Sequence, residues 1–145
     1  MNQAELRIMA EERLKDASAL IEGCRWEFAY YASGYVIECA LKSCVLARMI
    51  YTAWIFDDKR EKNAKECRTH DFSKLLELAE LKDQLDAEIK ASAAAGDEFA
   101  ANWGIVIEWK ETSRYEARSE TDAKRLFTAI ADEQHGVLRW IRTYW

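Results

Sequence analysis

The chain has 145 residues, a formal net charge of -5 at neutral pH and no proline. A length of this order fits one domain with one hydrophobic core. Proline interrupts helices, and the chain has none; it has only five glycines. We therefore expect a single all-α domain over residues 1–145. The negative charge argues against sequence-independent binding to nucleic acid through bulk electrostatics, although it leaves room for a local basic cleft.

Cysteine spacing and the apolar segments bear on cofactors and location. No two cysteines have the two-residue gap of a redox motif or a zinc knuckle, so we expect free thiols, no metal and no cofactor. No basic-then-apolar leader opens the sequence, and the longest apolar stretch, residues 28–47, carries Glu38 and Lys42 near its middle. Charges there are costly inside a bilayer, so we expect a cytoplasmic protein without membrane contact. The cysteines are Cys24, Cys39, Cys44 and Cys67.

Two long helices are predicted first. Residues 3–24 carry an apolar stripe at helical spacing, and Gly23 is expected to end the helix. Residues 25–56 form the most apolar segment and are expected to pack on several sides, with Gly34 allowing a neighbouring backbone to approach closely.

One face of this second helix is aromatic with a charged end. Tyr31, Tyr35, Glu38 and Lys42 follow at spacings of four, three and four, so they share a face. Glu38 and Lys42 either pair with each other or line a cleft or a dimer interface, because unpaired charges in an apolar helix are costly.

Shorter elements follow. Residues 57–68 lack periodicity and are predicted to be a loop or a frayed helix end. A helix then starts at Thr69 or Asp71, either of which is a suitable N-cap, and continues after a bend to an end near Gly96.

The last third of the chain is predicted to form a short helix over residues 99–109, an irregular stretch over 110–118, and two further helices. Asp97 is expected to cap the first of these, and Ser119 with Asp122 to form a capping box. The whole pattern predicts an up-and-down bundle of four to five main helices with additional short ones.

Three stretches together resemble the HEPN family: YASGYVIECALK at 31–42, THDFSKL at 69–75 and SRY at 113–115. The resemblance implies a helical bundle, frequent homodimers, and binding of nucleotides or RNA. Some relatives are partners of a small nucleotidyltransferase in toxin–antitoxin-like pairs. Others are metal-independent endoribonucleases, whose signature is an arginine followed by a histidine with four to six residues between them.

This sequence departs from the ribonuclease signature. Its two histidines are His70 and His135; Arg68 precedes the first with one residue between, and Arg125 precedes the second with nine. Arg68 and His70 are therefore weak catalytic candidates. The sequence favours a protein without enzymatic activity.

Five residues are candidates for ligand contact. His70, at a helix start, either takes part in a phosphate site, or helps to define the helix start, or bonds a carbonyl. Arg114 and Tyr115 would clamp a phosphate and stack on a base, or Arg114 would instead bridge Glu38. The full candidate set is Glu38, Lys42, His70, Arg114 and Tyr115.

Three functions remain open from the sequence. The first is a nucleotide- or RNA-binding module without strong catalysis, and the second is a protein-interaction partner of a nucleotidyltransferase. The third is a ribonuclease with a divergent site. The six Trp, six Tyr and five Phe favour a homodimer, and the aromatic C-terminal segment is expected to form an oligomer contact or to close the core.

Overall fold

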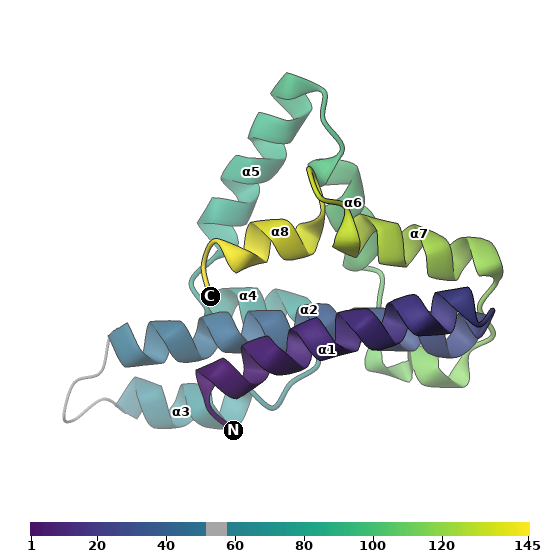
Figure 1. Cartoon of the computed structure of the whole chain (residues 1–145). Coiled ribbons are helices and arrows are strands. Elements are labelled where there is room, and N and C mark those ends of the chain that lie inside the picture. Colours follow the sequence, from purple (N-terminus) through teal and green to yellow (C-terminus); the bar gives the residue numbers. More distant parts are fainter. Residues whose placement is uncertain (52–57) are drawn as a thin grey trace.

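The computed structural model describes residues 1–51 and 58–145, and these fold into helices without any strand (Figure 1). The prediction of an all-α chain is confirmed. The elements are α1 (Gln3–Glu22), α2 (Trp26–Tyr51), α3 (Asp58–Glu66), α4 (Phe72–Leu78), α5 (Lys82–Ala95), α6 (Phe99–Val106), the 3-10 helix η1 (Glu111–Tyr115), α7 (Glu120–Ala131) and α8 (Val137–Arg142).

Local capping interactions fix most helix ends where the sequence predicts them. The Asp71 carboxylate accepts hydrogen bonds from the backbone N–H groups of Ser73 and Lys74 at 2.8 and 3.2 Å, which starts α4. Gly96 ends α5 with a left-handed φ of 70°. Ser119 and Asp122 form the predicted capping box of α7.

The prediction of a loop or frayed end over residues 57–68 was wrong for Asp58–Glu66, which form α3. The segment has no apolar stripe, but its composition is rich in lysine and glutamate, which favour helix intrinsically. Lys62 and Glu66 add an i,i+4 ion pair at 3.7 Å. Residues 52–57, which include the predicted end of the second helix and the start of this segment, lie outside the described ranges.

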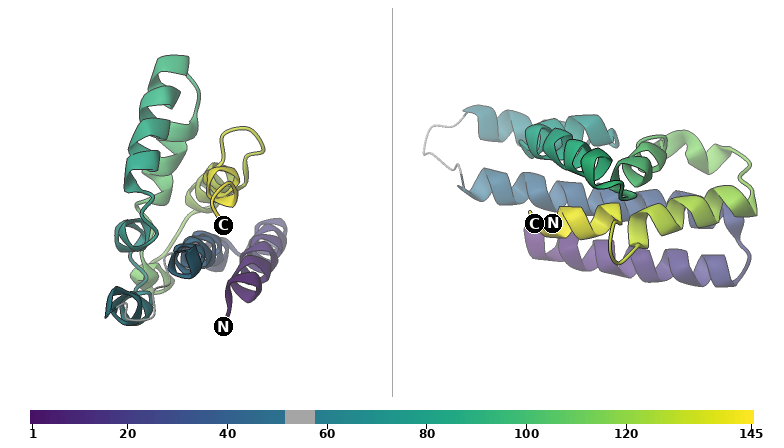
Figure 2. Two further views of the ribbon diagram at one scale, coloured as in Figure 1. Left: turned by 90° about the vertical axis from the view of Figure 1, so that its left-hand side faces the viewer. Right: turned by 90° about the horizontal axis from the view of Figure 1, so that it is seen from above.

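Helix α2 is the centre of the bundle. In the end-on view of Figure 2, α1 lies on one side of it, α3 and α4 lie on the other, and α7 with α8 cover it from above. Almost every side chain from Ala29 to Val45 is buried, as expected for a helix that packs on several sides. Helix α5 instead rises steeply from the bundle and contacts mainly α6 (Figure 1).

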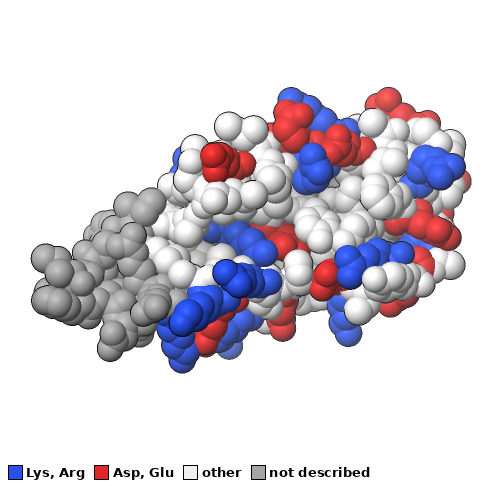
Figure 3. All heavy atoms as spheres, turned by 90° about the horizontal axis from the view of Figure 1, so that it is seen from below, with Lys and Arg blue, Asp and Glu red and all other residues white. Residues whose placement is uncertain are grey.

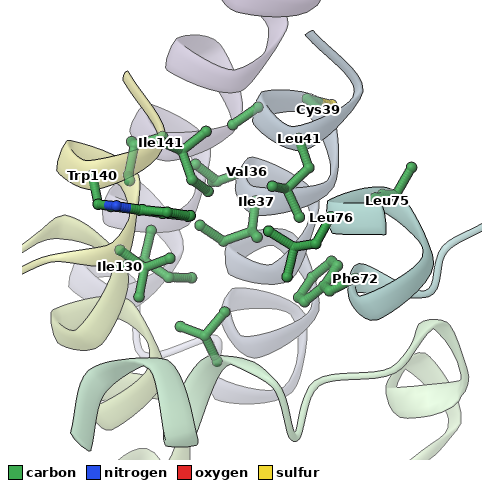
Figure 4. Packing of buried hydrophobic residues seen from close by; sticks show 14 of the residues in the cluster. Val36, Ile37, Cys39, Leu41, Phe72, Leu75, Leu76, Ile130, Trp140 and Ile141 are labelled. Atoms are coloured by element: carbon green, nitrogen blue, oxygen red, sulfur yellow. The ribbon is translucent and has the colours of Figure 1, made fainter. Parts of the chain in front are cut away.

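The core forms where α2 meets the later helices. Figure 4 shows Ile37 of α2 between Leu76 and Phe72 of α4 on one side and Trp140 of α8 on the other. The C-terminal helix is therefore part of the core, with its apolar residues buried. Within the described residues, no helix combines the length and the apolar character that spanning a bilayer requires.

Candidate functional site

A buried carboxylate lies at the middle of α2. The Glu38 side chain is 5% exposed and receives the Lys42 ammonium on Oε1 at 2.8 Å. Its second oxygen, Oε2, lies 2.9 Å from Nδ1 of His70. The predicted pairing of Glu38 with Lys42 is confirmed, and both oxygens of this carboxylate are hydrogen-bonded, which offsets the cost of burying the charge.

The His70 ring lies between two carboxylates. A carboxylate only accepts hydrogen bonds, so the Nδ1 atom facing Glu38 carries the hydrogen. On the other side of the ring, Nε2 lies 3.4 Å from Glu111 Oε2 in η1. The expectation that His70 bonds a backbone carbonyl was wrong, because side-chain carboxylates occupy both of its nitrogens.

Arg114 joins the same network through Glu111. Its Nη2 atom lies 3.3 Å from Glu111 Oε1, and its guanidinium lies beside the Tyr31 phenol, which raises the pKa of Arg114 above its ordinary value. The alternative in which Arg114 bridges Glu38 was therefore wrong, since Lys42 and His70 already satisfy that carboxylate.

Tyr115 meets this network only at Arg114, and Arg68 stays outside it. The Tyr115 side chain is exposed, and its ring centre lies 4.9 Å from the Arg114 guanidinium carbon. Arg68 is exposed, and no contact between described residues joins its side chain to His70. The structure thus links His70 to Arg114, through Glu111, and not to Arg68.

A single glycine brings η1 onto α2. A Cβ atom at Gly34 would lie 2.0 Å from Cε2 of Trp109, so the indole ring lies flat against the helix backbone. Trp109 also stacks on Phe72 of α4, with ring centres 5.2 Å apart and planes 6° from parallel. We expected a neighbouring backbone against Gly34, but a side chain takes that place and sets Glu111, two residues later, over His70.

Tyr31 and Tyr35 extend the network along α2 with their hydroxyl oxygens 3.0 Å apart. This hydrogen bond, together with burial and the nearby Glu38 charge, raises the pKa of Tyr35 well above its ordinary value. The Tyr35 phenol therefore remains neutral and available as a hydrogen-bond donor and acceptor.

An adjacent hollow contains three arginines, and we call it the arginine pocket. It has a volume of about 500 Å³ and lies between the α1–α2 turn, the first turns of α2 and the segment after η1. Its lining residues are Cys24, Arg25, Trp26, Glu27, Phe28, Tyr31, Arg114 and Arg118. Arg114 is thus the sequence candidate that lines the arginine pocket.

The charge of the arginine pocket is opposite to that of the whole chain. Three arginines and the single acid Glu27 give the lining a formal charge of +2, against -5 for the chain. Arg114 and Arg118 pair with Glu111 and Glu116, whereas Arg25 forms no ion pair with a described residue. On the face seen from below, acidic and basic side chains are intermingled (Figure 3).

Sequence reasoning missed three residues of this region. Glu111 precedes Arg114 by three positions, and an opposite-charge pair at that spacing was the available signal. Arg25 follows the glycine that ends α1, and Arg118 precedes the Ser119 cap, so both lie at turns where side chains of different helices meet.

Within the described part of the chain, no group of three or more histidine, cysteine or acidic side chains is arranged to hold a metal ion. No protein-family model, curated protein or solved structure matches the chain.

Proposed function

We propose that the protein binds the phosphate of a nucleotide or of RNA in the arginine pocket. The observation that carries this proposal is the convergence of Arg25, Arg114 and Arg118 on one aromatic-walled hollow in an acidic chain. Guanidinium groups match the geometry of phosphate oxygens, and aromatic walls suit a nucleobase. The resemblance to HEPN domains supports the same class of ligand.

The contacts that these arginines make, and the partners that they lack, favour an anionic ligand. Arg25 has no carboxylate partner among the described residues, and the Nε atom of Arg118 is buried without an acceptor there. Arg118 also lies over the Tyr30 ring, 4.2 Å from its centre, which holds its guanidinium in place. A phosphate in the pocket would pair with the exposed Arg25 guanidinium, whereas the buried Arg118 Nε lies out of its reach.

The polar network around Glu38 acts in this proposal as a support and not as a catalytic group. Carboxylates face both ring nitrogens of His70, and Glu38 neutralises the half-buried Lys42. The chain of contacts from Glu38 through His70 to Glu111 ends at Arg114. Its role is to position η1 and hence the Arg114 guanidinium beside the pocket.

Isothermal titration with AMP, ATP and a short single-stranded RNA tests the proposal. We expect Arg114→Ala to weaken binding at least tenfold, because a charge-assisted contact to phosphate is lost. Arg139→Ala is the control, since Arg139 is an exposed arginine of α8 that, among the described residues, bonds the Gln134 carbonyl alone. Heats equal to buffer for all three ligands would remove the proposal.

Glu111→Gln gives a second test, in which the affinity for the ligand should rise and not fall. The Glu111 carboxylate competes with a ligand for Arg114. A glutamine keeps the length of the side chain and an acceptor oxygen, so η1 stays in place while the competing charge is lost. Neutralisation should therefore strengthen binding up to about fivefold, the size expected for one partly exposed ion pair. Cys24 provides an independent readout, because it is exposed and lines the pocket. Saturating ligand should slow its alkylation by iodoacetamide.

A further inference from the structure

A second hollow continues from the arginine pocket, and we call it the apolar groove. It lies between α1 and the first turns of α2 and has a volume of about 680 Å³. Met9, Ala19, Leu20 and Ala32 contribute its apolar walls. Arg25, Phe28 and Tyr31 line both hollows, so the two adjoin, and we refer to them together as the cleft.

The positive charge of the cleft is concentrated at one end. In the apolar groove, Arg13 and Asp16 form an ion pair at 3.0 Å and neutralise each other. Arg25 lies where the two hollows meet, whereas Arg114 and Arg118 line the arginine pocket alone. A ligand that fills the whole cleft has an anionic group at one end and an uncharged, largely apolar body at the other.

The groove also carries features that distinguish a flat ring from an alkyl chain. Phe28 is 61% exposed at the junction of the two hollows, and its ring centre lies 5.9 Å from that of Tyr31. Such aromatic faces stack on nucleobases. Arg13 and Asp16 also offer a donor and an acceptor at the wall, which suit the edge of a base and have no partner on an alkyl chain.

We propose that the apolar groove binds the base of a 5′-mononucleotide whose phosphate is held in the arginine pocket. This inference rests on the proposed function and narrows it, because it assigns the two ends of one ligand to two adjoining hollows. The volume of each hollow lies in the usual range for small-molecule sites.

The test compares AMP with ribose 5-phosphate, which lacks the base, and with octyl phosphate, which replaces it by an alkyl chain. AMP should bind wild-type protein about tenfold more tightly than ribose 5-phosphate, the size expected for one stacked base. Ala19→Trp fills the groove from an exposed position of α1 without touching the arginine pocket. It should bring AMP down to the affinity of ribose 5-phosphate and leave the latter unchanged.

The matched control is Ala4→Trp, at an exposed position of the same helix outside the groove, which should leave both affinities unchanged. Equal affinities for AMP and ribose 5-phosphate, or tighter binding of octyl phosphate than of AMP, would overturn the base assignment. Either result would leave Arg114-dependent phosphate binding intact. Absence of binding by all three phosphates would overturn both proposals.

Discussion

At the scale of single residues, Glu38 decides whether the polar network holds together. Glu38→Gln keeps the shape of the side chain but removes the negative charge that Lys42 and His70 share. We expect the free energy of unfolding to fall by about 3 kcal/mol, because a buried ion pair loses one partner. Urea denaturation measures this, with Glu12→Gln as the control, since the Glu12–Lys15 pair lies on an exposed face. Equal effects of the two substitutions would contradict the burial argument.

Gly34 makes a second prediction at this scale. Gly34→Ala places a methyl group where Trp109 lies 2.0 Å away, and the ring is itself stacked on Phe72, so it has little room to move. We expect the free energy of unfolding to fall by about 1–3 kcal/mol, the usual cost of forcing an extra methyl group into a well-packed core. Gly104→Ala in α6 is the matched control, because nothing lies within 4 Å of a Cβ there. It should be neutral or stabilise the protein by about 0.5–1 kcal/mol.

The sequence identified some of these residues and not others for a physical reason. Glu38 and Lys42 stood out because charges inside an apolar helix need partners, and the pair forms. Glu111 lies in an irregular stretch, where no periodicity indicates which way a side chain points. Its position over His70 depends on the packing of Trp109 against Gly34, a contact between residues distant in the chain.

At the scale of the elements, caps fix the ends of the helices and give them a pH dependence. Hydrogen bonds from Ser92 and from the backbone N–H of Phe99 lower the pKa of Asp97 between α5 and α6. The folded protein therefore prefers the charged form more than the unfolded chain does. This contribution is present above the ordinary pKa of aspartate, near 4, and is lost as the pH falls through the lowered value.

Asp97→Asn tests that contribution. The variant should be less stable than wild type at pH 7, and the difference should shrink between pH 4 and pH 2, where the wild-type carboxylate becomes protonated. Urea midpoints across this range measure the effect. Asp86→Asn, at an exposed position of α5, is the control. A constant difference at every pH would show that the charge of Asp97 contributes nothing.

Helix positions were predictable where caps and apolar stripes agree, as at Asp71, Gly96 and Ser119. The one clear error, α3, is a helix whose sequence has charge but no apolar stripe. Periodicity detects the face that a helix buries, so it misses a helix with no such pattern.

At the scale of the whole molecule, α2 connects stability with the candidate site. Its apolar faces form the core against α4, α7 and α8 (Figure 4). Another face carries Tyr31, Tyr35, Glu38 and Lys42, which lead to η1 through His70. The arginine pocket and the apolar groove both begin at its first turns. The sequence could not predict these hollows, because each is lined by residues from segments that only the tertiary fold brings together.

The cysteines of α2 report on this central helix. Burial raises the pKa of Cys39 to about 11 and that of Cys44 to about 12, so at pH 8 at most about one thiol in a thousand is ionised. Neither should react with iodoacetamide until the bundle opens, whereas the exposed Cys24 should react at once. Mass spectrometry of peptides from a time course separates the three sites.

Gly34→Ala then distinguishes global opening from local motion. If the contact between Trp109 and α2 stabilises the whole bundle, the variant should speed the labelling of Cys44 by the same factor as it raises the equilibrium constant of unfolding. Labelling of Cys24 should be unaffected. Labelling of Cys44 as fast as Cys24 in the wild-type protein would show that α2 is not the rigid centre of the fold. An unchanged Cys44 rate in a destabilised variant would show that the Gly34–Trp109 contact stabilises only the attachment of η1, and then the Arg114 position alone depends on it.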